Sequence, residues 1–183
     1  VEADSPLKDL EKADKERINK DLSYIQKRIE NRMEEPNSRN KYIITGKILH
    51  LDGDRKYSEK SYRYYKKANL NAIVKNIPEN KQPKVVYNLL KIYNPDILII
   101  TGHDGMIKNV SKYDNIYNYR NSKYFIETVK EARRYDKDYN KNLVIFAGAC
   151  QSYFEALISA GANFASSPAR ILIDFVDPLI VAK

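Results

Sequence analysis

Hydrophobic positions change their spacing near residue 40, and this change divides the chain into two parts. In residues 1–35 the apolar side chains recur every three or four positions, which is typical of one face of an α-helix. This set consists of Leu7, Leu10, Ile18, Leu22, Ile25, Ile29 and Met33. Ser5 and Pro6 suit the start of such a helix, and Pro36 suits its end. The pattern predicts an N-terminal amphipathic helix and a polar connector, together forming residues 1–40.

Residues 41–183 show short apolar runs that alternate with helical periodicity. The runs are expected to be strands and cover residues 42–51, 72–77, 95–101, 142–147, 162–166 and 171–175. Helical patterns cover residues 56–68, 82–93, 122–135 and 152–160. Strands that alternate with helices predict an α/β domain with a mainly parallel sheet and helices on both faces, as in flavodoxin-like folds. One long polar stretch, residues 106–120, interrupts the alternation, and such loops are often functional.

Composition excludes several classes of protein. One cysteine and two histidines leave neither a disulfide framework nor a Cys/His metal site, and we expect no cofactor. No apolar run is long enough to span a bilayer. The net charge of +8 comes without an arginine-rich patch or RNA-binding motif, so we expect neither a nucleic-acid nor a membrane partner. Because the chain starts with Val1, we expect it to be a piece of a longer protein, and the oligomeric state stays open.

Residues able to do chemistry follow three of the predicted strands. In an open parallel sheet, ligands bind beyond the carboxyl ends of the strands. The segments at those ends are Asp52-Gly53-Asp54, Thr101-Gly102-His103-Asp104-Gly105 and Gly148-Ala149-Cys150-Gln151-Ser152. The only cysteine and one of the two histidines therefore fall at the same edge of the sheet. Cys150 also precedes a predicted helix, whose N-terminal amides would favour a thiolate and an oxyanion.

Each of these two residues also has an ordinary structural explanation. A lone cysteine is most often a small buried hydrophobic residue, and His103 would suit a turn. Their joint position favours a nucleophile and its base, because His103 precedes Cys150 by 47 residues and caspases have a similar spacing of about 50. No histidine follows Cys150, which argues against glutamine-amidotransferase-like enzymes. His50 lies inside a strand and is expected to be structural.

Five stretches resemble one known family. They are ILHLDGD (48–54), YNPDILIITGHDG (93–105), YRNSKYF (119–125), LVIFAGACQS (143–152) and AGANFASSPAR (160–170). Over residues 41–183 the sequence is similar to the sporulation-specific protease YabG family of spore-forming bacteria. The resemblance implies a caspase-like cysteine peptidase that acts on spore proteins, including coat proteins. It also implies a location in the cytoplasm of the sporulating cell or at the forming spore coat. The family's Cys–His pair corresponds to Cys150 and His103.

The resemblance and the residues predict one mechanism. Cys150 would attack a peptide carbonyl to form an acyl-enzyme, and His103 would serve as the base and then as the acid. The N–H groups of Cys150 and Gly105 would bind the oxyanion. Asp104 separates His103 from Gly105, where caspase-like enzymes have His-Gly. It is expected either to orient His103 or to be a turn residue.

Substrate choice is expected to depend on acidic side chains. Several caspase-like relatives select Arg or Lys before the cut through acids, one of which lies two positions before the cysteine, which is Gly148 here. Asp52 and Asp54 are therefore the expected acids of a basic pocket, and a plain turn is the alternative. Two other functions stay open. One is a non-catalytic flavodoxin-like ligand-binding or regulatory domain, and the other is a different thiol enzyme, such as an amidase.

The connector offers a candidate position for self-cleavage. Arg39 lies in a polar stretch between two expected ordered elements, where chains are readily nicked. If the enzyme prefers arginine, a neighbouring copy would cut after Arg39 and detach the N-terminal helix. The alternative is a plain linker with a solvated charge.

Overall fold

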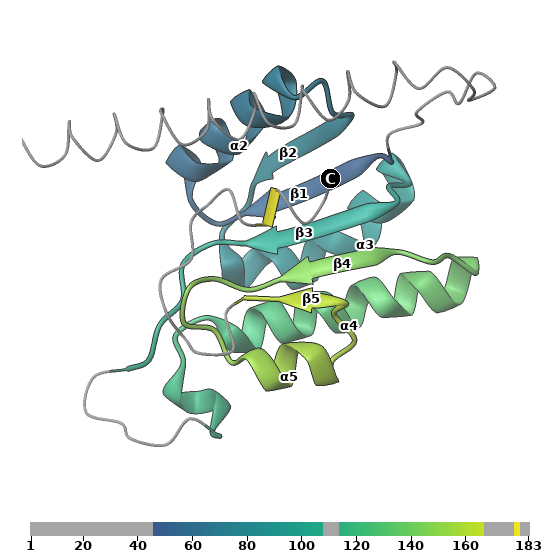
Figure 1. Cartoon of the computed structure of the whole chain (residues 1–183). Coiled ribbons are helices and arrows are strands. Elements are labelled where there is room, and N and C mark those ends of the chain that lie inside the picture. Colours follow the sequence, from purple (N-terminus) through teal and green to yellow (C-terminus); the bar gives the residue numbers. More distant parts are fainter. Residues whose placement is uncertain (1–45, 108–113, 167–177, 180–183) are drawn as a thin grey trace, which may run out of the picture. The chain divides into compact units, whose positions relative to one another are not determined.

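The computed structural model describes residues 46–107, 114–166 and 178–179 (Figure 1). The chain divides into two units, Val1–Ile44 and Thr45–Lys183, and every described residue belongs to the second. Three predictions therefore lie outside the described residues: the N-terminal helix, the connector with Arg39 and the strand at 171–175. The boundary expected at residue 40 also lies there.

The sheet has five strands that all run parallel, in the order β2-β1-β3-β4-β5. The strands are β1 (Ile48–Asp52), β2 (Ala72–Asn76), β3 (Ile97–Thr101), β4 (Val144–Ala147) and β5 (Phe164–Ala165). This is the flavodoxin-like order, in which the chain moves outward from β1 in one direction and from β3 in the other. In the register of the two central strands, Asp52 lies opposite Thr101, so both strands end at the same level.

Helices connect the strands. They are α2 (Arg55–Lys67), α3 (Gln82–Tyr93), α4 (Ser122–Tyr139) and α5 (Phe154–Ser159), with 3₁₀ turns at Glu79–Lys81 and Ile116–Asn118. Asp54 caps α2, because its side chain accepts a hydrogen bond from the Tyr57 N–H at 3.0 Å. Asn94 and Asn140 adopt the left-handed conformation and end α3 and α4.

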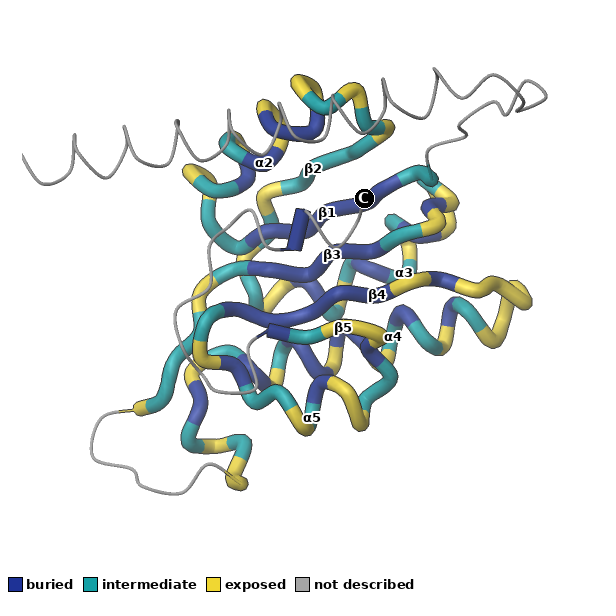
Figure 2. Tube along the Cα trace, viewed as in Figure 1, coloured by how far each residue is buried: buried dark blue, intermediate teal, exposed yellow. Residues whose placement is uncertain are grey.

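Side chains alternate between the two faces of the central strands. Leu49 and Leu51 belong to one core cluster with buried residues of α3, α4 and α5. His50 points to the opposite face, where its ring meets the ring of Tyr65 from α2 at 5.9 Å. Both faces are covered, so β1 is buried along its whole length (Figure 2). The prediction of an α/β domain with a parallel sheet and helices on both faces is confirmed.

Several element boundaries differ from the predicted ones, including that of β1, which begins at Ile48 and not at residue 46 or 47. Two of the differences have a clear physical reason. The helix expected from residue 152 begins at Phe154, because Ser152 belongs to a turn in which its N–H donates to the Ala149 carbonyl at 3.1 Å. The helix expected to end at residue 135 continues to Tyr139. Its last turn is held by ring contacts, with Tyr135 and Tyr139 centroids 4.9 Å apart.

Candidate functional site

The ends of β1, β3 and β4 form the edge of the sheet at which the chemistry was expected. The chain leaves β1 and β3 in opposite directions, and in flavodoxin-like sheets this reversal is where ligands bind. His103 follows β3 by two residues, and Cys150 follows the neighbouring strand β4 by three. The strand order therefore brings their segments to neighbouring strand ends.

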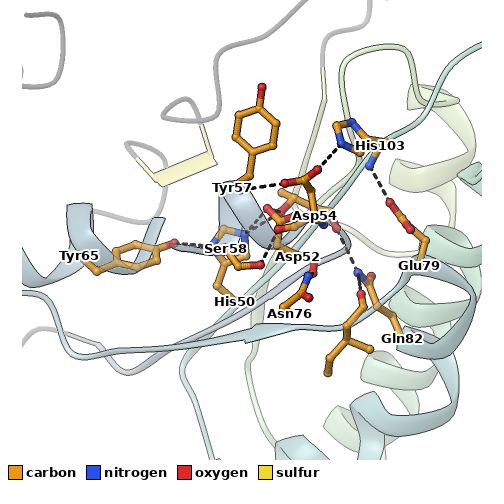
Figure 3. A network of polar contacts seen from close by, with 12 residues as sticks. His50, Asp52, Asp54, Tyr57, Ser58, Tyr65, Asn76, Glu79, Gln82 and His103 are labelled. Atoms are coloured by element: carbon orange, nitrogen blue, oxygen red, sulfur yellow. Dashed lines mark hydrogen bonds and ion pairs between the residues drawn. The ribbon is translucent and has the colours of Figure 1, made fainter. Parts of the chain in front are cut away.

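His103 is exposed and held by carboxylates on two sides (Figure 3). Its Nε2 lies 2.8 Å from Asp54 Oδ2, although 65% of its side chain is exposed. Its main-chain N–H donates to Glu79 Oε1 at 2.7 Å. The edge of the Tyr57 ring faces the imidazole, with centroids 5.9 Å apart. With Nε2 next to a carboxylate, Nδ1 is the ring nitrogen left to exchange a proton with another group.

Asp54 uses both of its carboxylate oxygens. Oδ2 contacts the His103 ring, and Oδ1 caps α2 by accepting the Tyr57 N–H. The partial burial of Asp54 alone would raise its pKa. The hydrogen bonds from His103 and from the Tyr57 N–H outweigh that effect, so the pKa of Asp54 is lowered. Asp54 is therefore a carboxylate at neutral pH and can accept a hydrogen bond from Nε2–H of His103.

Glu79, in the 3₁₀ turn after β2, is a site residue that the sequence reasoning missed. Its side chain extends across the ends of β1 and β3, where it fills the space beside two glycines. A Cβ on Gly53 would lie 2.3 Å from Glu79 Oε1, and one on Gly102 would lie 2.4 Å from the same atom. The glycines that follow two adjacent strands were the available signal, because they indicate close approach of another group.

Asp52 is buried beneath this turn, only 4% exposed. Its Oδ1 accepts the Asp54 N–H at 2.7 Å, and its Oδ2 accepts the Thr101 hydroxyl at 2.8 Å. Burial raises the pKa of Asp52, and these hydrogen bonds partly oppose the shift. Of the two acids expected to form a basic pocket, Asp54 is partly exposed and bonded to His103, whereas Asp52 faces the interior.

His50 belongs to the same buried chain of hydrogen bonds. Because Thr101 donates its only hydroxyl proton to Asp52, it must accept from His50 Nε2, which lies 2.7 Å away. His50 Nδ1 then accepts from the Tyr65 hydroxyl at 3.1 Å. The ring is 1% exposed, and burial lowers its pKa to about 3. His50 is therefore neutral at ordinary pH and already uses both ring nitrogens.

Cys150 lies half-buried in a tight turn directly after β4. Gly148 enters this turn with a φ of +114°, and a Cβ there would lie 2.6 Å from Ser166 Oγ. Glycine is therefore required at position 148 for two reasons: the positive φ is strained for other residues, and the neighbouring Ser166 leaves no room for a side chain. The Cys150 turn also touches the segment after β3, since a Cβ on Gly105 would lie 3.2 Å from Gln151 Oε1.

Asp104 does not contact the His103 ring in any hydrogen bond of the described residues. Its carboxylate instead accepts the N–H groups of Gly105 and Asn121, each at 2.8 Å. The second oxygen accepts the hydroxyl of Ser152 at 2.8 Å and that of Ser122. Two consequences follow for the sequence-based expectations. The group beside the His103 ring is Asp54, and the Gly105 N–H, expected at an oxyanion, already donates to Asp104.

Comparisons with known proteins identify the family. The sequence profile described as YabG peptidase U57 matches residues 1–183. The "Sporulation-specific protease YabG" of Bacillus subtilis (strain 168) is 49% identical over 143 residues, which are 78% of this chain and 49% of that protein. The chain belongs to the YabG peptidase family. The resemblance stated from the five sequence stretches is confirmed, and the chain spans about half the length of this relative.

A solved structure resembles the domain more distantly. The receiver domain of the histidine kinase CKI1 from Arabidopsis thaliana, crystallised with Mg²⁺, matches with a TM-score of 0.47 and 12% identity. The match covers 74% of this chain and 88% of that one. The fold of this YabG peptidase family member is assigned from its own strand order.

Two further properties concern the described part of this YabG peptidase family member. Within residues 46–107, 114–166 and 178–179, no three His, Cys, Asp or Glu side chains are grouped so that they could hold a metal ion. The helices in these ranges are all too short or too polar to cross a membrane.

Proposed function

We propose that the chain carries the catalytic domain of a cysteine endopeptidase that acts on spore proteins, including coat proteins, during sporulation. Membership in the YabG peptidase family supports a protease active in sporulation. The observation that carries the cysteine assignment is the hydrogen bond of 2.8 Å from Ser152 to Asp104. It joins the turn that contains the only cysteine to the segment that contains the only exposed histidine of the described residues.

The proposed reaction proceeds through an acyl-enzyme. The sulfur of Cys150 bonds to the carbonyl carbon of the scissile peptide while His103 accepts the thiol proton. When the C–N bond breaks, His103 gives this proton to the departing amine. A water molecule then attacks the thioester with His103 again as the base, and the thiol is regenerated as the acid product leaves.

Asp54 supports His103 in this proposal. Its carboxylate, 2.8 Å from Nε2, favours the tautomer that keeps the Nε2 proton and leaves Nδ1 for the thiol. It also stabilises the imidazolium that forms when His103 takes the proton. An aspartate plays the same part for the histidine of serine proteases.

The oxyanion would be held by the N–H of Cys150, at the start of a turn that leads into α5. Gly105 can contribute only if its N–H first leaves Asp104 Oδ1. We propose both N–H groups as oxyanion donors, and that of Gly105 requires a local rearrangement.

We also propose that cleavage follows a basic residue. The carboxylates of Asp52 and Asp54, together with that of Glu79, concentrate negative charge at the ends of β1 and β3. Asp54 is the member of the expected pair that a substrate cation can approach, since its side chain is 28% exposed against 6% for Asp52. Asp52 would act through its charge alone.

The test compares the wild-type chain with Cys150→Ala on casein and on a spore-coat extract, with N-terminal sequencing of the fragments. Asp138→Asn, at the exposed far end of α4, serves as the control variant, because the amide oxygen can still accept the Tyr87 hydroxyl that Asp138 accepts at 2.7 Å. We expect fragments from the wild type and the control only, with new N-termini that follow Arg or Lys. Equal cleavage by Cys150→Ala would refute the cysteine mechanism. Cleavage that does not prefer Arg or Lys would refute the proposed basic pocket but not the cysteine mechanism. If no variant, including the wild type, cuts either substrate, the result would favour a non-catalytic domain.

A further inference from the structure

Asp104 stands at the centre of the hydrogen bonds between the histidine and cysteine segments. Its carboxylate has four donors from three parts of the chain: two main-chain N–H groups and two serine hydroxyls. This number fills the acceptor capacity of a carboxylate. Since three of the four donors lie 17 or more positions from Asp104, this side chain connects separate segments and does not serve its own turn alone.

Ser122 and Ser152 connect the Asp104 carboxylate to the main chain of the Cys150 turn. Both are fully buried, and each donates its single hydroxyl proton to Asp104 Oδ2. Each hydroxyl oxygen then accepts a main-chain N–H, which is that of Ala149 at 2.9 Å for Ser152 and that of Tyr153 at 2.8 Å for Ser122. The carboxylate therefore fixes the direction of both hydroxyls. Through them it holds one amide directly before Cys150 and another three residues after it.

The histidine segment is tied to the same point. Asn121, which donates its N–H to Asp104, also donates its side-chain amide to the His103 carbonyl at 2.7 Å. The start of α4 thus holds the His103 main chain and, through Ser122, the far end of the Cys150 turn. The Asp104 side chain therefore links the two segments whose separation the proposed chemistry depends on.

We propose that Asp104 is a positioning residue that sets the backbone of residues 149–153, and with it the direction of the Cys150 N–H and thiol toward the reacting carbonyl. The inference rests on the proposed cysteine peptidase function. It gives Asp104, the residue that interrupts the His-Gly pair of caspase-like enzymes, a role toward the cysteine. Loss of the carboxylate removes the acceptor that orients both serines, so the turn loses its two amide anchors while substrate contacts elsewhere are kept.

The test uses Asp104→Asn, Ser152→Ala and Ser122→Ala, with Asp138→Asn as the same substitution at the exposed end of α4. Asparagine keeps the size of Asp104 but replaces one acceptor oxygen with a donor, so it cannot serve all four partners. We expect Asp104→Asn to lower kcat by about 100-fold with KM within about threefold, as expected when a reacting group is displaced by about 1 Å. The serine variants should each lose about tenfold, and Asp138→Asn should match the wild type.

Amide hydrogen exchange at Ala149 and Tyr153 provides a readout that does not depend on proteolysis. Exchange at both amides should accelerate in Asp104→Asn, and at only one amide in each serine variant, while exchange in the core of α4 stays unchanged. Unchanged exchange at both amides in Asp104→Asn would overturn the positioning role. Proteolysis by Cys150→Ala would instead overturn the cysteine peptidase mechanism. The hydrogen-exchange result for Asp104 would still be interpretable, because it does not depend on proteolysis. If Asp104→Asn fails to fold, Ser122→Ala and Ser152→Ala test the positioning role, because each removes a single hydroxyl. Unchanged exchange at Ala149 in Ser152→Ala and at Tyr153 in Ser122→Ala would then overturn it.

Discussion

The two histidines occupy contrasting surroundings although both lie near the carboxyl ends of the central strands. His50 is 1% exposed with both nitrogens bonded to neutral hydroxyls, whereas the His103 side chain is 65% exposed with one nitrogen beside a carboxylate. The two systems meet at the turn after β1, where Asp54 donates its N–H to Asp52. His50, inside a strand, is therefore neutral and bonded at both nitrogens, whereas His103, two residues past a strand, stays accessible to water.

Burial accounts for this contrast. A charged imidazole is strongly disfavoured away from water, which lowers the pKa of His50 to about 3. His103 instead keeps its contact with water, and its Nε2 lies 2.8 Å from the Asp54 carboxylate. The same residue type thus serves stability in one region and, in our proposal, catalysis in the other.

The largest expected effect belongs to His103→Ala. Removal of the proposed base should lower kcat/KM by about 10²- to 10⁴-fold, which is the usual contribution of general acid–base catalysis. The free energy of unfolding should change by less than about 0.5 kcal/mol, since the side chain is exposed. Peptide cleavage assays and urea unfolding measure the two quantities. Retained activity would show that His103 is not the base.

Asp54→Asn should have the next largest effect on activity. The amide can no longer stabilise the imidazolium or fix the Nε2–H tautomer, so we expect kcat to fall by about 10- to 100-fold. The helix cap should largely survive, because asparagine is as good an N-cap as aspartate. Steady-state kinetics checks the first point, and thermal unfolding checks the second. A fall in stability with unchanged kcat would assign Asp54 to the cap alone.

His50→Ala tests the other half of the contrast, which is that the buried histidine contributes to stability and not to catalysis. It leaves the Tyr65 and Thr101 hydroxyls without their buried partner and opens a cavity, so we expect a loss of about 2–4 kcal/mol of unfolding free energy. The kcat per folded molecule should stay within about twofold of the wild type. Urea unfolding and active-site titration separate the two effects. A large loss of kcat in a folded variant would mean that the buried chain takes part in catalysis.

The smallest expected effect is a pH dependence of stability. His50 has a pKa of about 3 in the folded chain and about 6.5 when unfolded, so between these values the unfolded state binds the extra proton. Its contribution to stability is present above pH 6.5 and is lost progressively as the pH falls toward 3. Asp52, whose raised pKa acts in the opposite sense, makes a matched variant necessary.

That variant is His50→Gln, which removes the titrating ring and leaves Asp52 in place. Urea unfolding of both chains at pH 7, 6 and 5 gives the difference in slope. We expect the wild type to lose stability more steeply than His50→Gln over this range. Equal slopes would mean that folding does not lower the pKa of His50.

Much of this architecture could be predicted from sequence because it depends on local patterns. Buried apolar runs identified the strands, and the rule that ligands bind at carboxyl ends placed His103 and Cys150 at one edge. The directions of side chains depend on three-dimensional packing and could not be predicted. Asp104 is adjacent to His103 in the chain yet points to the Cys150 turn, while the carboxylate at the imidazole comes from Asp54, 49 positions away.

The roles of Glu79 and Ser152 also could not be predicted from the sequence. Glu79 reaches the site from a turn after β2, and no motif marks it apart from the two glycines that it crowds. Ser152 was expected to begin a helix, but its hydroxyl and N–H hold the Cys150 turn closed. Both residues act through contacts between segments that are remote in sequence.

The central claim is that Cys150 and His103 work as a pair, and the chain's only cysteine makes it directly measurable. The measurement is the rate at which iodoacetamide alkylates the native chain from pH 5 to 9, followed by mass spectrometry, in parallel with residual proteolysis. We predict rapid alkylation of Cys150 at neutral pH, loss of proteolysis in step with labelling, and at least about tenfold slower labelling in His103→Ala. Labelling no faster than that of a free cysteine peptide and unaffected by His103→Ala, or full proteolysis after complete alkylation, would contradict the account.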